Sequence, residues 1–161
     1  MLRFPTLALS LALALALAGL GPRSARAQET DESAISAANR PRVKLNRLTF
    51  PAGLVGAKGY EAHLRRALQH EARHADWGTG KGGKISYRFV IERLELREEA
   101  GVLHVTCTAL GRLPKGKSAK SHIAFGGDPR KRTQVVERVL DIVARGVVTR
   151  LAELERARRT P

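Results

Sequence analysis

Three residues near the middle of the chain, His70, Glu71 and His74, could together form a hydrolytic metal site. They occur in the string His-Glu-Ala-Arg-His, and two histidines four residues apart lie on the same side of a helix. Such a pair can bind one Zn²⁺, while the glutamate acts as the general base that activates a metal-bound water. A zinc-dependent hydrolase is therefore one function that the sequence allows.

This string resembles the signature of zinc metallopeptidases, and the resemblance implies a catalytic zinc. The sequence departs from the family pattern at Arg73, because the family keeps that position uncharged. The extended form of the signature is also absent, since Trp77 and Gly80 stand in place of its glycine and its third histidine. A catalytic zinc needs a third protein ligand, and no motif singles one out.

The alternative to a zinc site is a solvated helix surface. Its histidine and basic side chains would form a stripe on the outer side of the helix, made of His63, Arg66, His70, Arg73 and His74. We favour this stripe and expect no catalytic residue, no bound metal and no cofactor. The zinc hydrolase remains the alternative hypothesis, with zinc as its cofactor, His70 and His74 as ligands and Glu71 as general base.

Two other strings carry less chemical information. Residues 78–84 (GTGKGGK) nearly spell a phosphate-binding loop, but Ile85 stands where a metal-binding hydroxyl is needed. The string also joins a helix to a strand, whereas a phosphate-binding loop follows a strand and begins a helix. Cys107 is the only cysteine, so no internal disulfide can form, and its alternating apolar neighbours predict that it is buried. Trp77 is expected to cover the edge of the core.

The first 27 residues are arranged like a cleavable secretory signal. Arg3 precedes the apolar run at residues 7–20, and the small residues at 25–27 offer a cleavage site before Gln28. The apolar run is shorter than the roughly 20 residues of a membrane-spanning helix. We therefore expect an exported protein, periplasmic or extracellular, with no membrane span in the mature chain.

The remaining chain divides into a leader and one domain. Residues 28–41 are polar and almost free of large apolar side chains, which predicts a disordered leader. Residues 42–158 are long enough to form a single domain with its own core. Hydrophobic periodicity in this domain predicts strands at 43–50, 85–97, 102–110 and 121–125, and helices at 60–76 and 129–157.

Local details specify how these strands pair. The alternation in 85–97 changes parity midway, and one extra residue near Glu92 would restore a common apolar face, so we predict a β-bulge there. Residues 98–101 predict a hairpin turn. Placing Val105 opposite Phe125 and Cys107 opposite Ile123 matches apolar with apolar side chains across the next pair. Asp128, followed by a proline, has the form of a helix N-cap.

The predicted fold class is α+β, with the element order β-α-β-β-β-α. Hairpins make the sheet antiparallel, and two amphipathic helices pack on one of its faces. The other face remains in water. This order of elements over residues 43–157 resembles small envelope-associated α+β domains of bacteria, such as the amino-terminal domain of TolB-type proteins. The resemblance concerns architecture and implies no functional residues.

The most distinctive chemical property is positive charge. The chain has a formal net charge of +14, and removal of residues 1–27 would leave about +11. If the apolar residues face the helices, basic side chains occupy the open face of the sheet and the adjoining loop. The predicted ligand-binding residues are Arg88, Arg93, Arg97, His104, His122, Lys115 and Lys117.

These residues favour an anionic partner, because guanidinium and ammonium groups form charge-assisted hydrogen bonds with carboxylates and phosphates. The alternative is a solvated outer face without a ligand, whose positive charge is partly balanced by Glu95 and Glu98. The few aromatic residues argue against a stacking platform for nucleic acid. We therefore expect a non-catalytic binding module whose partner is an envelope protein or an anionic polymer.

Overall fold

The computed structural model describes residues 41–79, 83–114 and 116–159, and every structural statement below refers to these residues. The predicted signal peptide and disordered leader lie outside them. The elements follow the predicted order: β1 (Arg42–Thr49), α2 (Ala57–His74), β2 (Lys84–Glu99), β3 (Val102–Arg112), β4 (Ser118–Gly127), the 3₁₀ turn η1 (Pro129–Lys131) and α3 (Arg132–Arg159). The α+β fold class is therefore confirmed.

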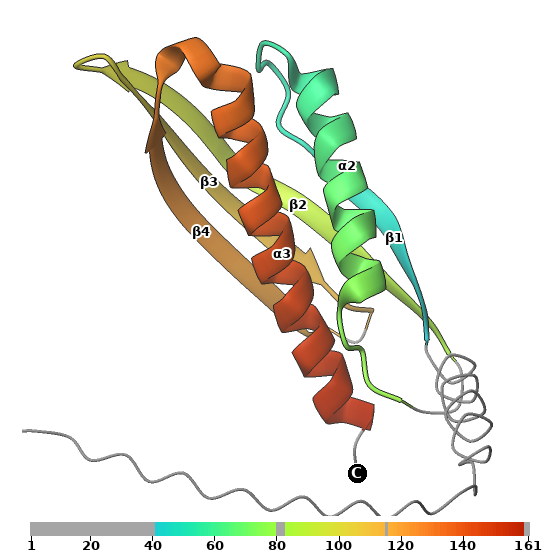
Figure 1. Ribbon diagram of the computed structural model, residues 1–161. Helices are drawn as coiled ribbons and strands as arrows, with labels where there is room; N and C mark the ends of the chain where they lie inside the picture. Colours follow the sequence, from blue (N-terminus) through green and yellow to red (C-terminus); the bar gives the residue numbers. More distant parts are fainter. Residues whose placement is uncertain (1–40, 80–82, 115, 160–161) are drawn as a thin grey trace, which may run out of the picture.

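The four strands form one sheet in the order β1-β2-β3-β4, and both helices lie over the same face of it (Figure 1). Strands β2, β3 and β4 form the predicted antiparallel meander. Strand β1 pairs parallel with β2, so the sheet as a whole is mixed and not antiparallel as predicted. The reason is the helical connection: α2 carries the chain back along the sheet, so β1 and β2 start at the same end.

The predicted details of strand pairing are confirmed. Ile91 pairs with Ala109 and Arg93 pairs with Thr108, which leaves Glu92 as the extra residue of a β-bulge. The two predicted pairs between β3 and β4, Val105 with Phe125 and Cys107 with Ile123, are both present. Strand β4 is longer than predicted at both ends, because its serines and glycines pair with β3 despite their low strand propensity.

The core lies between the sheet and the two helices. Val105 and Cys107 of β3 are fully buried against the helices, and burial raises the pKa of the Cys107 thiol to about 12. Trp77 is only 4% exposed and its Nε1 donates a hydrogen bond to the carbonyl oxygen of Ala72 at 2.9 Å. It therefore covers the edge of the core as expected, and Cys107 is a buried, unreactive thiol.

Polar contacts connect the two helices along their solvent-facing seam. Asp76, just after α2, pairs with Arg156 of α3 at 2.8 Å. At the other end, His63 of α2 lies between two carboxylates of α3, 2.7 Å from Asp141 and 3.6 Å from Glu137. His63 is half-buried in this seam, so its predicted place in an exposed outer stripe is wrong. The helical period carries it toward α3 because it lies three residues after the buried Tyr60 and four before Ala67, which also packs against the core.

Helix α3 is held at both ends by side-chain hydrogen bonds. Asp128 accepts a hydrogen bond from the backbone N–H of Arg130 at 2.9 Å, so it is an N-cap as predicted, but of the 3₁₀ turn η1 that leads into α3. Near the other end, Glu155 is only 5% exposed and accepts hydrogen bonds from Arg158 Nε at 3.0 Å and Arg159 Nε at 3.1 Å. The hydrogen bonds from Arg158 are the main reason why the pKa of the Glu155 carboxyl is lowered.

Within the described ranges, neither helix is long and apolar enough to span a membrane.

The close packing of α3 on the sheet predicts a large effect at Gly111 of β3. A Cβ atom there would lie 2.5 Å from Val147 and 2.7 Å from Leu151, so Gly111→Ala should force α3 away from the sheet. We expect a loss of about 1–3 kcal/mol in the free energy of unfolding, measured by urea denaturation. Gly146→Ala is the control, because a Cβ at this exposed helical position meets only Ser121 Oγ at 3.6 Å. It should be neutral or stabilise by up to about 1 kcal/mol. Equal effects of the two substitutions would contradict this packing.

Glu155 should make stability depend on pH in the acid range. The folded-state pKa of its carboxyl group lies below the usual 4.5. The ionised carboxylate therefore contributes its full stabilisation above pH 4.5, and this stabilisation is lost as the pH falls through the folded-state pKa. At pH 7 we expect Glu155→Gln to cost about 1–3 kcal/mol of unfolding free energy. The difference from the wild type should shrink below pH 4.5. Glu153→Gln, which removes an exposed partner of Arg150, is the control and should cost less than about 0.5 kcal/mol. If the loss of unfolding free energy in Glu155→Gln stayed constant below pH 4.5, the ionised Glu155 carboxylate would not be the source of the stabilisation.

Candidate functional site

The face of the sheet opposite the helices is the main candidate surface. In the described part of the chain no helix covers it, and alternate residues of the four strands point from it into solvent. All the described phenylalanine, tyrosine and tryptophan side chains belong to the core on the other side. We refer to this surface as the open face; its residues are polar or basic apart from a few, such as Val90 and Leu110.

The predicted binding residues occupy two distant parts of the molecule. The open face carries Arg88, Arg93, Arg97, His104 and His122, as expected from the alternation. Arg88 and Arg97 lie at opposite ends of β2, roughly 30 Å apart at the rise of an extended strand. Lys117 lies off the open face, because its Nζ donates to the carbonyl oxygen of Leu154 in α3 at 3.4 Å. Lys115 is outside the described residues.

The half of the open face near the β2–β3 hairpin neutralises its own charge. Glu95 lies 2.6 Å from Arg93 and 3.8 Å from Arg97, so one carboxylate serves both guanidinium groups. The second carboxylate on this part of the sheet, Glu92 at the bulge, pairs with Lys120 at 3.0 Å. These basic side chains are therefore already engaged within the protein.

His122 on the same half is engaged as well. Its Nδ1 lies 2.9 Å from Thr108 Oγ1 on the neighbouring strand, a hydrogen bond between two side chains of the open face. His104, one of the five predicted residues on this face, is exposed.

The other half of the open face holds three arginines in one row. Arg47 of β1 is opposite Arg88 of β2, which is opposite Arg112 of β3. All three are exposed, and none has a hydrogen bond or ion pair with another described residue. Neighbouring strands are about 4.8 Å apart, so the side chains start at that spacing. We call Arg47, Arg88 and Arg112 the arginine row; of these three, the sequence predicted only Arg88 as a binding residue.

Two β-bulges create the arginine row. If Asn46 paired regularly with Arg88 instead of bulging out, Arg47 would fall opposite Phe89 and point into the core. If Glu92 paired regularly with Ala109, Arg112 would also fall opposite Phe89. Beside the row, the open face has a hollow of about 270 Å³ that is lined by Asn46, Ser86, Arg88 and Arg112, among others. Hydroxyl and amide groups therefore accompany the guanidinium groups at this end.

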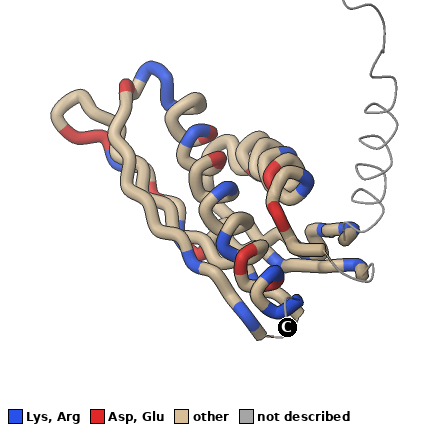
Figure 2. The backbone as a smooth tube through the Cα atoms, turned by 60° about the horizontal axis from the view of Figure 1, so that its bottom comes forward, with Lys and Arg blue, Asp and Glu red and all other residues tan. Residues whose placement is uncertain are grey.

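The uneven distribution of charge is visible along the backbone. Figure 2 shows basic segments gathered near the C terminus, where strand ends and the last turns of α3 come together. The tip of the β2–β3 hairpin carries Glu98 and Glu99 and is acidic. The hairpin tip is thus acidic and the end that contains the arginine row is basic, while the exposed Arg130, Lys131 and Arg132 form a second basic segment beside the hairpin end.

The described neighbours of the histidine string on α2 do not complete the ligand set of a catalytic zinc. His70 and His74 are exposed and their ring centroids are 4.4 Å apart, whereas Glu71 pairs with Arg145 of α3 at 3.5 Å. Among the residues that the structure describes, no three histidine, cysteine or acidic side chains are arranged to hold a metal ion. A catalytic zinc does not fit this arrangement, because a third ligand is missing and the required base is held by an arginine.

Comparisons with known proteins assign no family. No family model matches the chain, and no curated protein matches it. Among solved structures, it is similar to a candidate lipoprotein from Caulobacter crescentus CB15, with 12% identity, 81% of this chain and 96% of that chain covered, and a TM-score of 0.42.

Two further solved structures are similar at the same low level. A minor lipoprotein from Acinetobacter baumannii shows 15% identity, with 75% of this chain and 90% of that chain covered and a TM-score of 0.32. A PelC variant from Paraburkholderia phytofirmans, crystallised as a dodecamer, shows 12% identity, with 71% and 86% covered and a TM-score of 0.35. No function is transferred from these similarities.

Proposed function

We propose that this chain is an exported, non-catalytic α+β binding module that binds an anionic polymer through the open face of its sheet. The observation that supports the proposal is the arginine row. Like charges directly opposite each other on neighbouring strands destabilise a sheet, and here three arginines are aligned without a carboxylate partner among the described residues. A bound anion would remove this repulsion.

The chemistry of the arginine row suits repeated anionic groups. Each guanidinium can donate two parallel hydrogen bonds to one carboxylate, sulfate or phosphate group. Because Arg47, Arg88 and Arg112 extend from adjacent strands, they can contact successive charges of an extended polymer. Ser86 and Asn46 in the adjoining hollow can add neutral hydrogen bonds. The positive net charge, about +11 after removal of residues 1–27, would also speed the approach of a polyanion.

An anionic polymer fits this surface better than a folded protein partner does. The strongest contacts in protein–protein interfaces come from aromatic and other large side chains seated in pockets. The open face presents no described aromatic side chain apart from histidine. Of its larger apolar residues, Val90 and Leu110 are half-buried beside the arginine row, and Val102 at the hairpin end is exposed. The surface therefore offers charge and hydrogen bonds rather than hydrophobic anchors.

Binding of a fluorescently labelled heparin fragment, measured by anisotropy at fixed salt, tests the proposal. The double substitution Arg88→Gln and Arg112→Gln should weaken binding at least tenfold and reduce its salt dependence, because two unpaired cations are lost. The matched control is Arg93→Gln with Arg97→Gln, which removes the same charge from two arginines that share the nearby carboxylate of Glu95. The control should weaken binding by less than about threefold.

Two results would contradict the proposal. Equal losses in the two double variants would show that net charge alone attracts the polymer. Unchanged binding in the Arg88 and Arg112 variant, with the fold intact by circular dichroism, would exclude the arginine row as the binding site.

A further inference from the structure

A second concave site lies at the C-terminal end of α3. It is at the same end of the sheet as the arginine row, but toward the helices. There, the start of β2, the end of β3 and the last turns of α3 enclose a cavity of about 510 Å³. Its charged lining includes four cationic side chains, Lys84, Lys117, Arg158 and Arg159, and one carboxylate, Glu155. Leu113 and Pro114 contribute apolar surface. The described lining therefore carries a net charge of three positive units.

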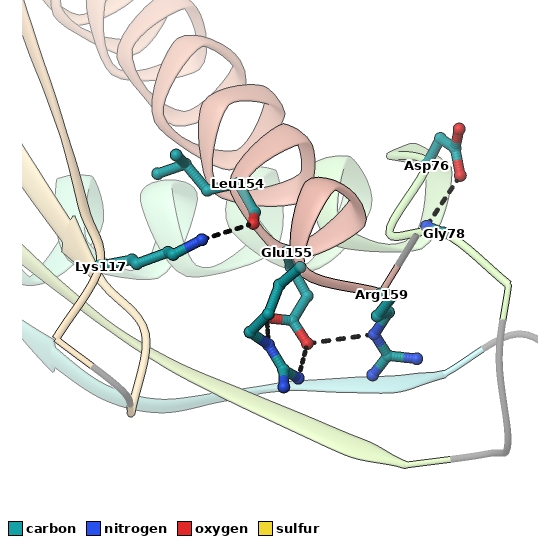
Figure 3. Close-up of polar contacts among 7 residues, drawn as sticks. Asp76, Gly78, Lys117, Leu154, Glu155 and Arg159 are labelled. Atoms are coloured by element: carbon teal, nitrogen blue, oxygen red, sulfur yellow. Dashed lines mark hydrogen bonds and ion pairs between the residues drawn. The ribbon is translucent and has the colours of Figure 1, made fainter. Parts of the chain in front are cut away.

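Glu155 fixes the two arginines of this cavity. Its carboxylate accepts hydrogen bonds from Arg158 Nε at 3.0 Å, Arg158 Nη2 at 2.5 Å and Arg159 Nε at 3.1 Å (Figure 3). These contacts leave Arg158 Nη1 and both terminal nitrogens of Arg159 without a described acceptor. The Arg159 side chain is only 13% exposed, so its guanidinium is held at the cavity rather than extended into solvent. A preorganised guanidinium loses little entropy when it binds an anion.

Lys117 adds an adjustable charge at the rim. Its Nζ donates to the carbonyl oxygen of Leu154, close to the end of α3, but this contact is long at 3.4 Å and exposed (Figure 3). An ammonium group on a flexible side chain can leave such a contact for a stronger anionic acceptor. Lys84, at the start of β2, is also exposed at the cavity.

We propose that this cavity binds a small ligand that carries one carboxylate or phosphate group on a compact apolar body. The anionic group would contact Arg159 and the two lysines, and the apolar body would lie against Leu113 and Pro114. The cavity volume is within the range of small-molecule sites, and a mainly apolar wall with a few convergent charged groups is typical of them. This cavity adjoins the hollow beside the arginine row and shares Ser86, Leu113 and Pro114 with it, but its charged residues are different ones, so charge substitutions can separate the two sites.

The test uses octanoate, octyl phosphate and inorganic phosphate as probes in isothermal titration calorimetry of the mature chain. We expect saturable one-site binding of octanoate or octyl phosphate, with the tighter of the two identifying the preferred anionic group. Inorganic phosphate should bind at least tenfold more weakly, because it lacks the apolar body. Equal affinity for inorganic phosphate, or no saturable binding of any probe, would overturn the proposal.

Two variants locate the site without disturbing Glu155 and its arginines. Lys84→Gln with Lys117→Gln should weaken binding at least fivefold, and Pro114→Trp should weaken it by filling the apolar wall without changing any charge. Arg88→Gln with Arg112→Gln is the matched charge control and should leave octanoate binding unchanged. Full affinity in both the lysine and the Pro114 variants would place the ligand elsewhere. Because Pro114 also lines the hollow of the open face whereas Lys84 and Lys117 line only this cavity, the lysine variant distinguishes failure of this site from failure of polymer binding.

Discussion

The structure depends on the burial of one face of a four-stranded sheet under two helices. No disulfide is possible with a single cysteine, so apolar contact between β2, β3 and the helices must hold the domain together. Gly111 allows α3 to approach β3 closely, and Trp77 covers the edge of the same core. Since both helices are used on this side, the opposite face is left to solvent and becomes available for binding.

The same strand geometry that builds the core also arranges the charges. The bulges at Asn46 and Glu92 keep apolar residues facing the helices while they turn Arg47 and Arg112 to the same side as Arg88. The hairpin half of the face instead uses Glu95 and Glu92 to neutralise its cations. The contrast between a compensated half and an uncompensated half is the basis for proposing that binding occurs at one end of the sheet.

Periodicity predicted the elements, the bulge at Glu92 and the register of Val105 with Phe125, because alternation in a half-buried strand has only one arrangement that buries every apolar residue. It did not predict that β1 pairs parallel with β2, since no local pattern specifies the partner of an isolated strand. Arg47 was missed for that reason. Arg112 was missed because the third strand was ended at Leu110, although the predicted bulge and turn would have placed it opposite Arg88. The cavity at the end of α3 brings together residues more than 70 positions apart, which spacing along the chain cannot reveal.

The most direct test of the account is the reactivity of single thiols in the folded protein. Cys107 and position 104 lie on the same strand but on opposite faces of the sheet. With Ellman's reagent, Cys107 of the wild type should stay unlabelled until the protein is unfolded in denaturant. A His104→Cys, Cys107→Ala variant should react at the rate of a free thiol without denaturant. Equal labelling rates of the two thiols in the folded protein would contradict the division of the sheet into a buried face and an open face.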